Sequence, residues 1–593
     1  MVKEAFDEVY FVSAEDWSRD ATSFFHSNPM QLSYAHGVSE IPLIGQTIGD
    51  RLDEVAGKIP DNIALVGVLE KQRFTYASFR TEVDRVARAL LLLNVQKGDR
   101  VGIWSTNCVA WVLTQFATAK IGAILVTINP AYRVHELEYA IRQSECNVLI
   151  SGTGFKEDEY AGMLLELIPE LLAAAAGQLH SKRFPHLRTI IFLGAITPPG
   201  MRSWDEFISR DDQVPVAALA ERQSALDCDD VINIQYTSGT TGFPKGAMLT
   251  HHNILNNSFW VGDRLHLTPQ DRVCIPVPFY HCFGMVLGNM ACVAHGATMI
   301  IPAPHFSPLQ TLEAVALERC TALYGVPTMF IAELDHPRFR EFDLSSLRTG
   351  IMAGAPCPVE VMKRVISEMH CPEITIACGM TETSPVCNMT EIDDPIELRC
   401  GSVGKVMPHQ EQKIVDPATG RTLPRGEHGE LCYRGYNVMR GYYNNPQATC
   451  DTIDAAGWLH GGDLAMMNEN GYVQITGRLK DMICRGGEKI FPREVEEFLF
   501  TQPKIAEAYV IGVPDSYYGE QVMAWVKLKP GERMSPEELK SFCQGKIMNY
   551  KIPKYVKFVD DFPKTVTGKV QKFRMREVAT EELGLAQPDK KAA

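Results

Sequence analysis

The chain has 593 residues, of which 45% are hydrophobic and 22% are charged, and its formal net charge is -14. This length favours three or four structural units of about 150 residues each. The composition is typical of a globular protein rather than a disordered or collagen-like one. The negative balance argues against nucleic acid as the main partner, because neutralising its phosphates requires a broad basic face. Small anionic substrates remain possible, because basic residues can be concentrated around a small binding site.

The sixteen cysteines show no paired CxxC spacing, which favours reduced thiols over a disulfide scaffold or a zinc site. The first residues mix Lys3 with several acidic side chains and resemble neither a signal peptide nor a transit peptide. The most apolar stretch, residues 282–302, contains glycines, Asn289 and His295, so it favours a helix followed by a buried strand over a membrane span. We therefore expect an intracellular protein with no integral membrane segment.

Residues 42–199 alternate helical patterns with short apolar runs such as RVGIW and AILVTI. This is the rhythm of strands joined by helices. The alternation resumes after Asp230 with VINIQYTS, ATMIIP and LRTGIMAG, each ending in small or turn-forming residues. Because α/β proteins place ligands where buried strands end in glycine-rich loops, we expect the functional site at these ends.

The pattern changes at residues 401–475 to short strands with frequent glycine and asparagine, which predicts a small antiparallel or barrel-like unit. A new β/α/β pattern begins after Lys480. We therefore place a boundary there and expect two domains, residues 1–479 and 480–593. The expected fold class is α/β, with parallel sheets, helices and the barrel-like unit in a large N-terminal domain and a small α+β C-terminal domain.

Residues 236–246, YTSGTTGFPKG, lie between the strand-like VINIQ and the helix-like HHNILNNSFWV. Glycines let backbone N–H groups approach an anion, hydroxyl groups add donors, and Lys245 adds a mobile charge. Pro244 excludes a Walker A loop, and the run is not a GxSxG nucleophile elbow. We predict a phosphate-binding loop; the alternative is an ordinary solvent-exposed loop.

Six further runs follow in order: PFYHCFG (278–284), MAGAP (352–356), CGMTETSP (378–385), HGGD (460–463), GRLKD (477–481) and TVTGKVQKF (565–573). Together with the loop they resemble the motifs of the adenylate-forming, AMP-binding superfamily. The phrases LYGVPTMF and KDMICRGGEKIFP are most similar to the mitochondrial medium-chain acyl-CoA synthetases within it. The resemblance covers nearly the whole chain.

The resemblance implies a ligase that converts a fatty acid and ATP to acyl-AMP and pyrophosphate, and then transfers the acyl group to CoA with release of AMP. Mg²⁺ would assist, and the C-terminal domain would be mobile. The mitochondrial matrix is implied as the location, or the cytoplasm if no longer precursor exists. The alternatives are an aryl-CoA ligase, a luciferase-like oxidase and a catalytically silent nucleotide-binding scaffold. The sequence leaves the oligomeric state open.

The resemblance also implies roles for individual residues. The ATP-binding set is Thr237, Ser238, Gly239, Thr240, Thr241, Gly242, Phe243, Pro244, Lys245, Asp463, Arg478 and Lys569. The adenine-side set is Gly354, Ala355, Pro356, Cys378 and Gly379. The CoA-side set is Arg485, Gly486, Gly487 and Glu488, with Lys480 as the hinge.

Four residues are implied in catalysis. Lys569 would bridge the substrate carboxylate and the α-phosphate, and Glu382, beside Thr381, would hold Mg²⁺. His281 would either border the acyl pocket or pack as an ordinary core histidine. The alternatives are a surface or capping role for Glu382 and an ion-pair role for Asp463 or Arg478.

Two positions depart from the family pattern. Cys378 stands where an aromatic residue often stacks on adenine, and Gly461 stands where the family usually has a threonine. We expect the first change to weaken ATP binding. The length of the acyl pocket depends on the packing of Phe283, Val326, Met329 and Met380.

Overall fold

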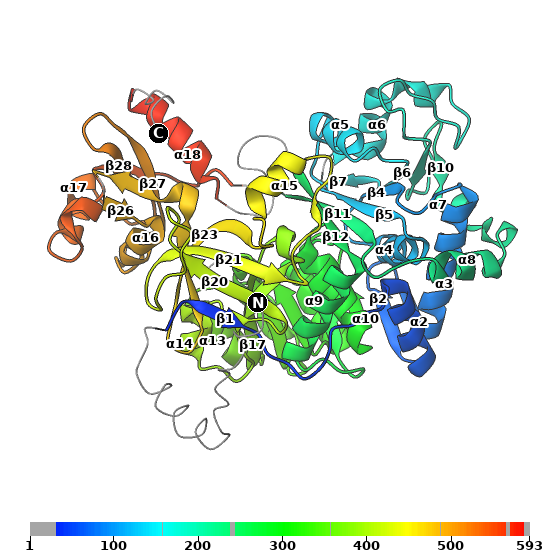
Figure 1. The fold of residues 1–593 in the computed structure, drawn as a ribbon, viewed down its shortest axis with the longest axis horizontal. Coiled ribbons are helices and arrows are strands. Elements are labelled where there is room, and N and C mark those ends of the chain that lie inside the picture. The colour runs from blue at the N-terminus through cyan, green and yellow to red at the C-terminus, as the bar shows by residue number, and fades with distance from the viewer. Residues whose placement is uncertain are drawn as a thin grey trace, which may run out of the picture.

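The computed structural model describes residues 31–156, 158–237, 244–355, 357–486, 488–564 and 570–585. Within these ranges the chain builds two large mixed sheets with helices packed around them, an antiparallel sheet, and a smaller C-terminal sheet (Figure 1). The two large sheets carry the alternation of strands and helices that the sequence predicts, so the α/β fold class is confirmed.

The first large sheet has eight strands in the order β10-β9-β6-β4-β5-β11-β12-β22. The strands are β4 (Arg100–Trp104), β5 (Ile124–Ile128), β6 (Val148–Ser151), β9 (Thr189–Phe192), β10 (Arg202–Ser203), β11 (Val231–Thr237), β12 (Lys245–Thr250) and β22 (Gly441–Tyr442). Strands β10 to β11 are parallel, whereas β12 and β22 add in antiparallel fashion. Two strands of two residues each, β7 (Gly154–Phe155) and β8 (Asp158–Glu159), pair with each other outside this eight-stranded sheet.

The second large sheet has nine strands in the order β19-β18-β17-β16-β15-β13-β14-β2-β3. The strands are β2 (Ile63–Gly67), β3 (Gln72–Thr75), β13 (Arg272–Cys274), β14 (Thr298–Ile301), β15 (Ala322–Gly325), β16 (Thr349–Ala353), β17 (Glu373–Gly379), β18 (Val386–Met389) and β19 (Lys405–Val406). Its six central strands are parallel, which is why they are almost entirely apolar and buried.

Helices cover both sheets and separate them. They are α2 (Ile48–Lys58), α3 (Tyr76–Leu92), α4 (Val109–Ile121), α5 (Val134–Gln143), α6 (Tyr160–Leu167), α7 (Trp204–Ile208), α8 (Val216–Ser224), α9 (His251–Arg264), α10 (Ala291–His295), α11 (Pro308–Glu318), α12 (Pro327–Leu334), α13 (Val359–Glu368), α14 (Ile396–Gly401) and α15 (Pro446–Thr452). Helix α4 is apolar on nearly all faces because it contacts both β5 of one sheet and β2 of the other. The largest hydrophobic core therefore lies between the sheets.

Polar side chains set the start of α9 and satisfy a buried lysine of α4. The Thr250 hydroxyl accepts the N–H of Asn253, and the Asn253 side chain accepts the N–H of Thr250, so α9 begins with a reciprocal cap. Lys120 donates to carboxylate oxygens of Asp53 and Asp84, each at 2.6 Å. Two partners offset the cost of removing this charge from water.

The third sheet is antiparallel, as predicted for residues 401–475. Its order is β1 (Tyr34–His36), β20 (Gln410–Val415), β21 (Gly429–Gly435), β23 (Leu459–Met467) and β24 (Val473–Arg478). Strand β1 comes from the other end of the chain and forms an edge of the sheet, which the sequence analysis did not predict. A strand of three residues is too short to show an alternating pattern.

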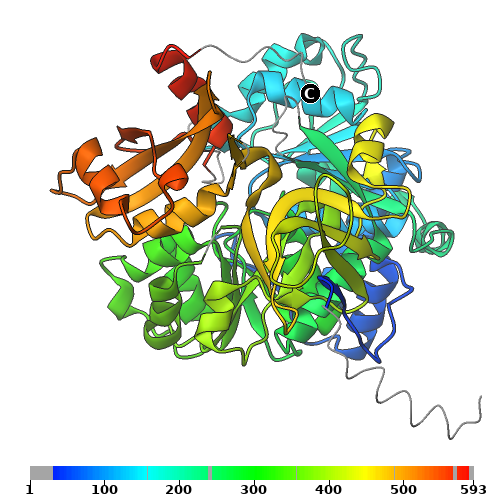
Figure 2. The same cartoon turned by 60° about the vertical axis from the view of Figure 1, so that its left-hand side comes forward.

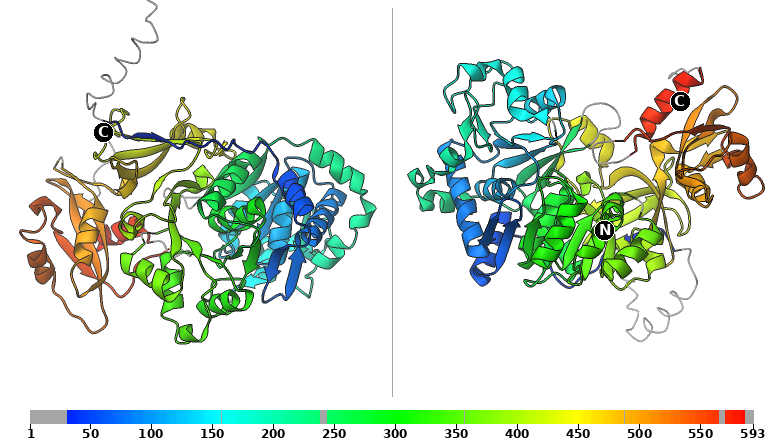
Figure 3. Two further views of the ribbon diagram at one scale, coloured as in Figure 1. Left: turned by 90° about the horizontal axis from the view of Figure 1, so that it is seen from below. Right: turned by 180° about the vertical axis from the view of Figure 1, so that it is seen from behind.

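The C-terminal part forms a separate lobe with its own apolar cores, drawn in orange and red (Figures 1 and 2). Its sheet contains β25 (Ile483–Arg485), β26 (Glu488–Ile490), β27 (Ile505–Asp515), β28 (Gly519–Leu528) and β29 (Tyr555–Phe558). Its helices are α16 (Pro492–Phe500), α17 (Pro536–Cys543) and α18 (Lys572–Glu582). The lobe projects from one side in both views of Figure 3.

The apolar stretch 282–302 forms a helix and a strand, as predicted. A π-helical segment, η3 (Phe283–Met290), runs into α10 and is followed by β14. Among the residues that the structure describes, no helix is both long enough and apolar enough to cross a membrane.

Candidate functional site

The phosphate-loop run is anchored by two strands that pair with each other. Thr237 at the end of β11 lies opposite Lys245 at the start of β12, and the Thr237 hydroxyl donates to the Lys245 carbonyl at 3.4 Å. The intervening candidates lie outside the described residues: Ser238, Gly239, Thr240, Thr241, Gly242 and Phe243. Between the predicted strand and the predicted helix the structure adds a further strand, because KGAMLT forms β12 between β22 and β11 before α9 begins.

Lys245 and Glu382 are linked through a tyrosine that the sequence analysis did not select. The Tyr442 hydroxyl donates to Oε1 of Glu382 at 2.7 Å. The Lys245 Nζ lies 4.9 Å from the centre of the same ring, within the range of a cation–π interaction. At the base of the loop, the Tyr139 hydroxyl donates to the Pro244 carbonyl at 2.9 Å. These contacts bring a carboxylate and an ammonium group together beside the loop.

Glu382 lies in a single turn, η5 (Thr381–Thr383), between β17 and β18. Its carbonyl accepts the N–H of Met439 at 2.9 Å. The turn requires glycine at position 379, because a β-carbon there would lie 1.8 Å from the Pro385 carbonyl oxygen. The chain thus presents Glu382 from a tightly packed backbone.

The adenine-side candidates meet at the ends of two neighbouring strands. Gly354 and Ala355 follow β16, whereas Cys378 and Gly379 end β17, and the two strands are parallel partners. Gly354 has a φ of +86°, which favours glycine. Pro356 lies outside the described residues. These candidates thus lie at carboxyl ends of parallel strands, where α/β proteins place ligands.

Cys378 is half-buried, and burial, followed by the nearby charge of Asp463, raises the pKa of its thiol to about 12. The thiol is therefore neutral at physiological pH and offers a small apolar surface rather than an aromatic ring. Gly461 is the second position that departs from the family pattern, with glycine where the family usually has threonine. A β-carbon at this position would lie 2.3 Å from Cε of Met380. The Met380 side chain occupies the space that a threonine would need.

Asp463 and Arg478 face each other across β23 and β24. They are directly opposite in register, and the Arg478 Nε donates to Oδ1 of Asp463 at 2.9 Å. Only 14% of the Asp463 side chain is exposed, against 37% for Arg478. The ion pair considered as an alternative is therefore present. It holds one carboxylate oxygen of Asp463.

His281 precedes the π-helical segment and is half-buried rather than fully enclosed. Its ring lies 4.3 Å from that of Tyr280. The neighbouring Cys282 is buried, and its thiol donates to Oε1 of Gln235 on β11 at 3.2 Å. The motif is therefore fixed to the strand that leads into the phosphate loop, and π-helical turns are frequent at functional sites.

The hinge candidate lies between the third sheet and the C-terminal sheet, and the CoA-side candidates lie at β25 and β26, the first two strands of the C-terminal sheet along the chain. Lys480 lies in η6 (Leu479–Asp481), and burial, followed by the Arg478 charge, lowers its pKa. The Arg485 Nε donates to Oε1 of Gln521 at 2.8 Å, and its guanidinium lies 4.0 Å from the Tyr518 ring centre.

Gly486 follows Arg485 with a φ of +59°, and its N–H donates to the Tyr518 carbonyl at 2.8 Å. Glu488 pairs with Arg485 across β25 and β26. Gly487 and Lys569 lie outside the described residues.

The two parts of the chain match two domain families. Residues 52–443 match the AMP-binding enzyme family, and residues 494–569 match the AMP-binding enzyme C-terminal domain. The chain belongs to the AMP-binding enzyme family. Among its curated relatives, the Bacillus subtilis protein YngI, named as an inferred acyl-CoA synthetase, is 51% identical over 92% of this chain and 99% of that protein.

Other AMP-binding relatives cover a similar share of the chain. Human ACSF2, named a mitochondrial medium-chain acyl-CoA ligase, is 44% identical over 93% of this chain and 91% of that protein. Two solved structures share the fold. The anthranilate CoA ligase AuaEII with anthranoyl-AMP has a TM-score of 0.77 and 27% identity over 92% of this chain and 99% of that chain. ATP-bound MatB from Rhodopseudomonas palustris has a TM-score of 0.75 and 28% identity over 91% of this chain and 100% of that chain.

Proposed function

We propose that the chain is an ATP-dependent acyl-CoA ligase that activates a medium-chain fatty acid. The carboxylate attacks the α-phosphorus of ATP, pyrophosphate leaves, and the CoA thiol then displaces AMP from the acyl adenylate. The observation that carries the proposal is the set of contacts around Glu382, Tyr442 and Lys245, which lies beside the phosphate-loop strands of an AMP-binding enzyme. Relatives named acyl-CoA ligases or synthetases over more than nine-tenths of the chain support the acyl-CoA product.

The proposed nucleotide site uses Asp463 for the ribose hydroxyls, with Arg478 fixing the carboxylate plane. Gly354, Ala355, Cys378 and Gly379 would border the adenine at the ends of β16 and β17. The loop 237–245 would receive the phosphates, because its end carries Lys245 and its sequence is rich in donors. Each assignment predicts a loss of ATP affinity on substitution.

Glu382 is the residue that would hold a magnesium ion, because Mg²⁺ prefers carboxylate, phosphate and water oxygens. Tyr442 holds Oε1, so the carboxylate is oriented before a ligand arrives. When bound, Mg²⁺ supplies positive charge that offsets the phosphate charges during phosphoryl chemistry. Lys569 is the residue proposed to neutralise the attacking carboxylate and α-phosphate, because approach of two anions is the main barrier.

We further propose that Lys480 separates the two domains, residues 1–479 and 480–593, and acts as the hinge. Its position in a short turn between β24 and β25 supports this role. Rotation about Lys480 would move Lys569 away from the proposed site. It would bring the loop with Arg485, Gly486 and Glu488 toward the site instead. One site could then serve both half-reactions.

The acyl preference rests on the relatives, since ACSF2 proteins are named medium-chain ligases. Two of the proposed pocket residues lie within the site motifs. They are Phe283, whose ring centre is 6.0 Å from that of Tyr324, and Met380, which packs on Gly461.

Two locations accord with the relatives. ACSF2 is named mitochondrial, whereas YngI comes from a bacterium; an import assay on the full-length precursor distinguishes matrix from cytoplasm.

A panel of acids tests the function. Short-, medium- and long-chain fatty acids, benzoate and anthranilate are each incubated with ATP, Mg²⁺ and CoA, and AMP and the CoA thioester are quantified. We expect the highest kcat/KM with medium-chain acids. A preference for the aromatic acids would favour the aryl-CoA ligase instead, and absence of a thioester with every acid would overturn the proposal.

Exchange of labelled pyrophosphate into ATP tests the rival idea of a catalytically silent scaffold. The wild-type chain should exchange label only when an acid is present. The exchange rate of Lys569→Ala should be lower by at least about 100-fold. If neither the wild type nor Lys569→Ala exchanges label, the result would support the scaffold.

A further inference from the structure

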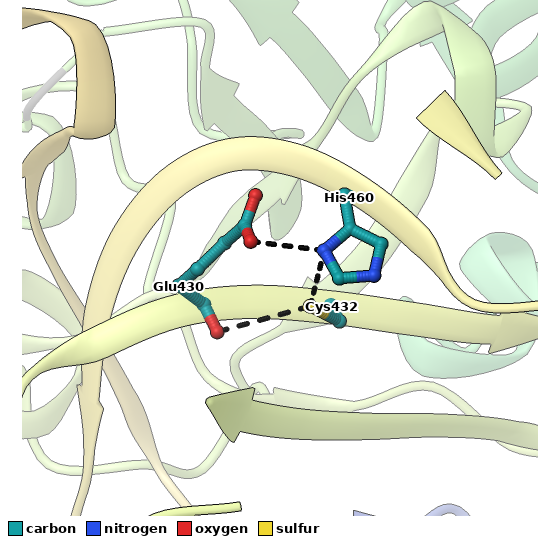
Figure 4. A group of neighbouring side chains, drawn as sticks. All are labelled: Glu430, Cys432 and His460. Carbon is teal, nitrogen blue, oxygen red and sulfur yellow. Dashed lines mark hydrogen bonds and ion pairs between the residues drawn. The ribbon is translucent and has the colours of Figure 1, made fainter. Parts of the chain in front are cut away.

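Three side chains with metal-binding chemistry converge in the third sheet, next to the proposed ribose carboxylate. Glu430 and Cys432 lie on β21 and His460 lies directly opposite Cys432 on β23. Nδ1 of His460 is 2.9 Å from Oε2 of Glu430 and 3.4 Å from Sγ of Cys432, so all three groups point to one spot (Figure 4).

Carboxylates lie on both sides of the His460 ring. Nδ1 lies 2.9 Å from Oε2 of Glu430, and a hydrogen on Nδ1 satisfies this contact when no ion is bound. On the other side of the ring, Nε2 lies 3.6 Å from Oδ2 of Asp454. This second carboxylate would hold the hydrogen on Nε2 when Nδ1 binds an ion, as partners of metal-binding histidines commonly do.

We propose that Glu430, Cys432 and His460 bind a divalent cation that favours thiolate and imidazole ligands, of which Zn²⁺ is the representative. Zinc bonds are about 2.3 Å to sulfur and about 2.0–2.2 Å to nitrogen and oxygen, so tetrahedral ligands lie about 3.3–3.6 Å apart. The separations of 2.9 and 3.4 Å need only a small outward shift. The thiol proton leaves to solvent, and thiolate plus carboxylate balance the ion's two charges.

The surroundings suit a bound ion. Cys432 is fully buried and Glu430 is 8% exposed, whereas 31% of the His460 side chain faces solvent. The exposed part of the His460 side chain leaves the site open to solvent on one side, from which a water would supply the fourth ligand. Buried protein ligands with one open side form a three-ligand site of the kind that keeps an exchangeable position.

The site is coupled to the nucleotide-binding strand. Oε1 of Glu430 accepts the N–H of Gly462 at 3.3 Å, and Gly462, with a φ of +71°, immediately precedes Asp463. The register of β21 and β23 shifts between Glu430 and Cys432. A bound cation would therefore hold the irregular backbone that carries Asp463. The binding itself does not depend on the proposed ligase activity.

The chain offers a matched control. Asp227, Cys228 and Asp229 also bring two carboxylates and a thiol close together. These residues are consecutive in a surface turn and include no histidine, and Asp227 and Asp229 are exposed. Cys228→Ser therefore removes a thiol from an acidic group without touching the third sheet.

The full chain is stripped with a chelator and titrated with Co²⁺, whose thiolate charge-transfer absorption reports a cysteine ligand, and Zn²⁺ is added as competitor. We expect one Co²⁺ per chain with a thiolate band that Zn²⁺ abolishes, in wild type and Cys228→Ser alike. Cys432→Ser should lose the band, and His460→Gln and Glu430→Gln should weaken binding at least about 10-fold. Thermal melting identifies any variant that fails to fold, and the other two then carry the test.

A wild-type chain without a thiolate band would overturn the proposal and leave a metal-free hydrogen-bonded triad. The same conclusion follows if the band disappears in Cys228→Ser and persists in Cys432→Ser. Zn²⁺ should also raise the Tm of wild type and not that of His460→Gln, because an ion that binds only the folded state stabilises it.

Discussion

Tyr442 donates its phenolic hydrogen to Oε1 of Glu382 across 2.7 Å, although the two residues are 60 positions apart in the chain. Burial, followed by the charge of Glu382, raises the pKa of Tyr442, so the hydroxyl keeps its hydrogen at physiological pH. The same ring lies beneath the ammonium group of Lys245. One side chain thus positions both the proposed magnesium-associated carboxylate and the loop lysine.

Tyr442→Phe keeps the ring and removes this hydrogen bond. Hydrogen bonds to charged groups contribute about 1.5–3 kcal/mol, so we expect adenylate formation to slow about tenfold or more. The Mg²⁺ concentration for half-maximal rate should rise as well. Pyrophosphate exchange across a Mg²⁺ titration measures both effects. Tyr443→Phe is the control, because it removes a comparable 2.9 Å bond to Glu145; equal losses in the two variants would contradict a specific role for Tyr442.

Gly379→Ala tests whether the turn that carries Glu382 requires a residue without a β-carbon at position 379. Its β-carbon would lie 1.8 Å from the Pro385 carbonyl oxygen, and backbone cannot move aside as a side chain can. We expect a loss of about 3 kcal/mol in the free energy of unfolding, measured by urea denaturation. Gly57→Ala, within α2 and with no atom within 4 Å of the new β-carbon, should instead be neutral or stabilising. A neutral Gly379→Ala would show that the turn is less constrained than its packing indicates.

The features that depend on local pattern could be predicted from the sequence. Buried parallel strands are continuous apolar runs, so the alternation of strands and helices is visible in the residue pattern alone. Strand β12 was missed because KGAMLT has polar ends and a glycine, and only its pairing with β11 and β22 makes it a strand. Short segments stabilised by distant partners carry no local signal.

The same limit applies to side chains of the candidate site. Tyr442 lies in the run RGYYNNP, which matches none of the site motifs, and its role emerges only when Glu382 is brought beside it. Gly461 was noted as a departure, but Met380, which explains it, lies 81 positions away in sequence. The expectation that the cysteines form no zinc site considered only close Cys–Cys spacings, whereas Cys432 meets His460 from a neighbouring strand.

Arg478→Lys tests whether the arginine orients Asp463 or merely supplies charge. A lysine keeps the positive charge but cannot reproduce the planar contact that Nε makes with Oδ1 at 2.9 Å. We expect the KM for ATP to rise several-fold, with a smaller change in kcat. Steady-state kinetics at saturating acid and CoA measure both. Arg434→Lys is the control, because its Nε makes a 2.8 Å contact with Glu411 in the same sheet; a similar rise in that variant would count against the role of Arg478.

His251, the first residue of α9, links stability to pH. It is fully buried, and its Nδ1 accepts the N–H of Ile48 at 3.1 Å. Burial lowers its pKa from 6.5 to about 4. The folded chain therefore holds a neutral imidazole over a range in which the unfolded chain binds a proton, so acid favours unfolding.

The stability that depends on neutral His251 is fully present above pH 6.5 and is lost as the pH falls toward 4, by about 3 kcal/mol in total. His251→Asn keeps a hydrogen-bond acceptor for Ile48 and removes the titrating group. Its Tm should start lower at neutral pH, because the smaller side chain leaves space, yet decline less between pH 7.5 and 5 as measured by differential scanning calorimetry. His252→Asn, on the half-exposed neighbour, should keep the wild-type slope. Parallel Tm profiles for wild type and His251→Asn would assign the acid sensitivity to other groups.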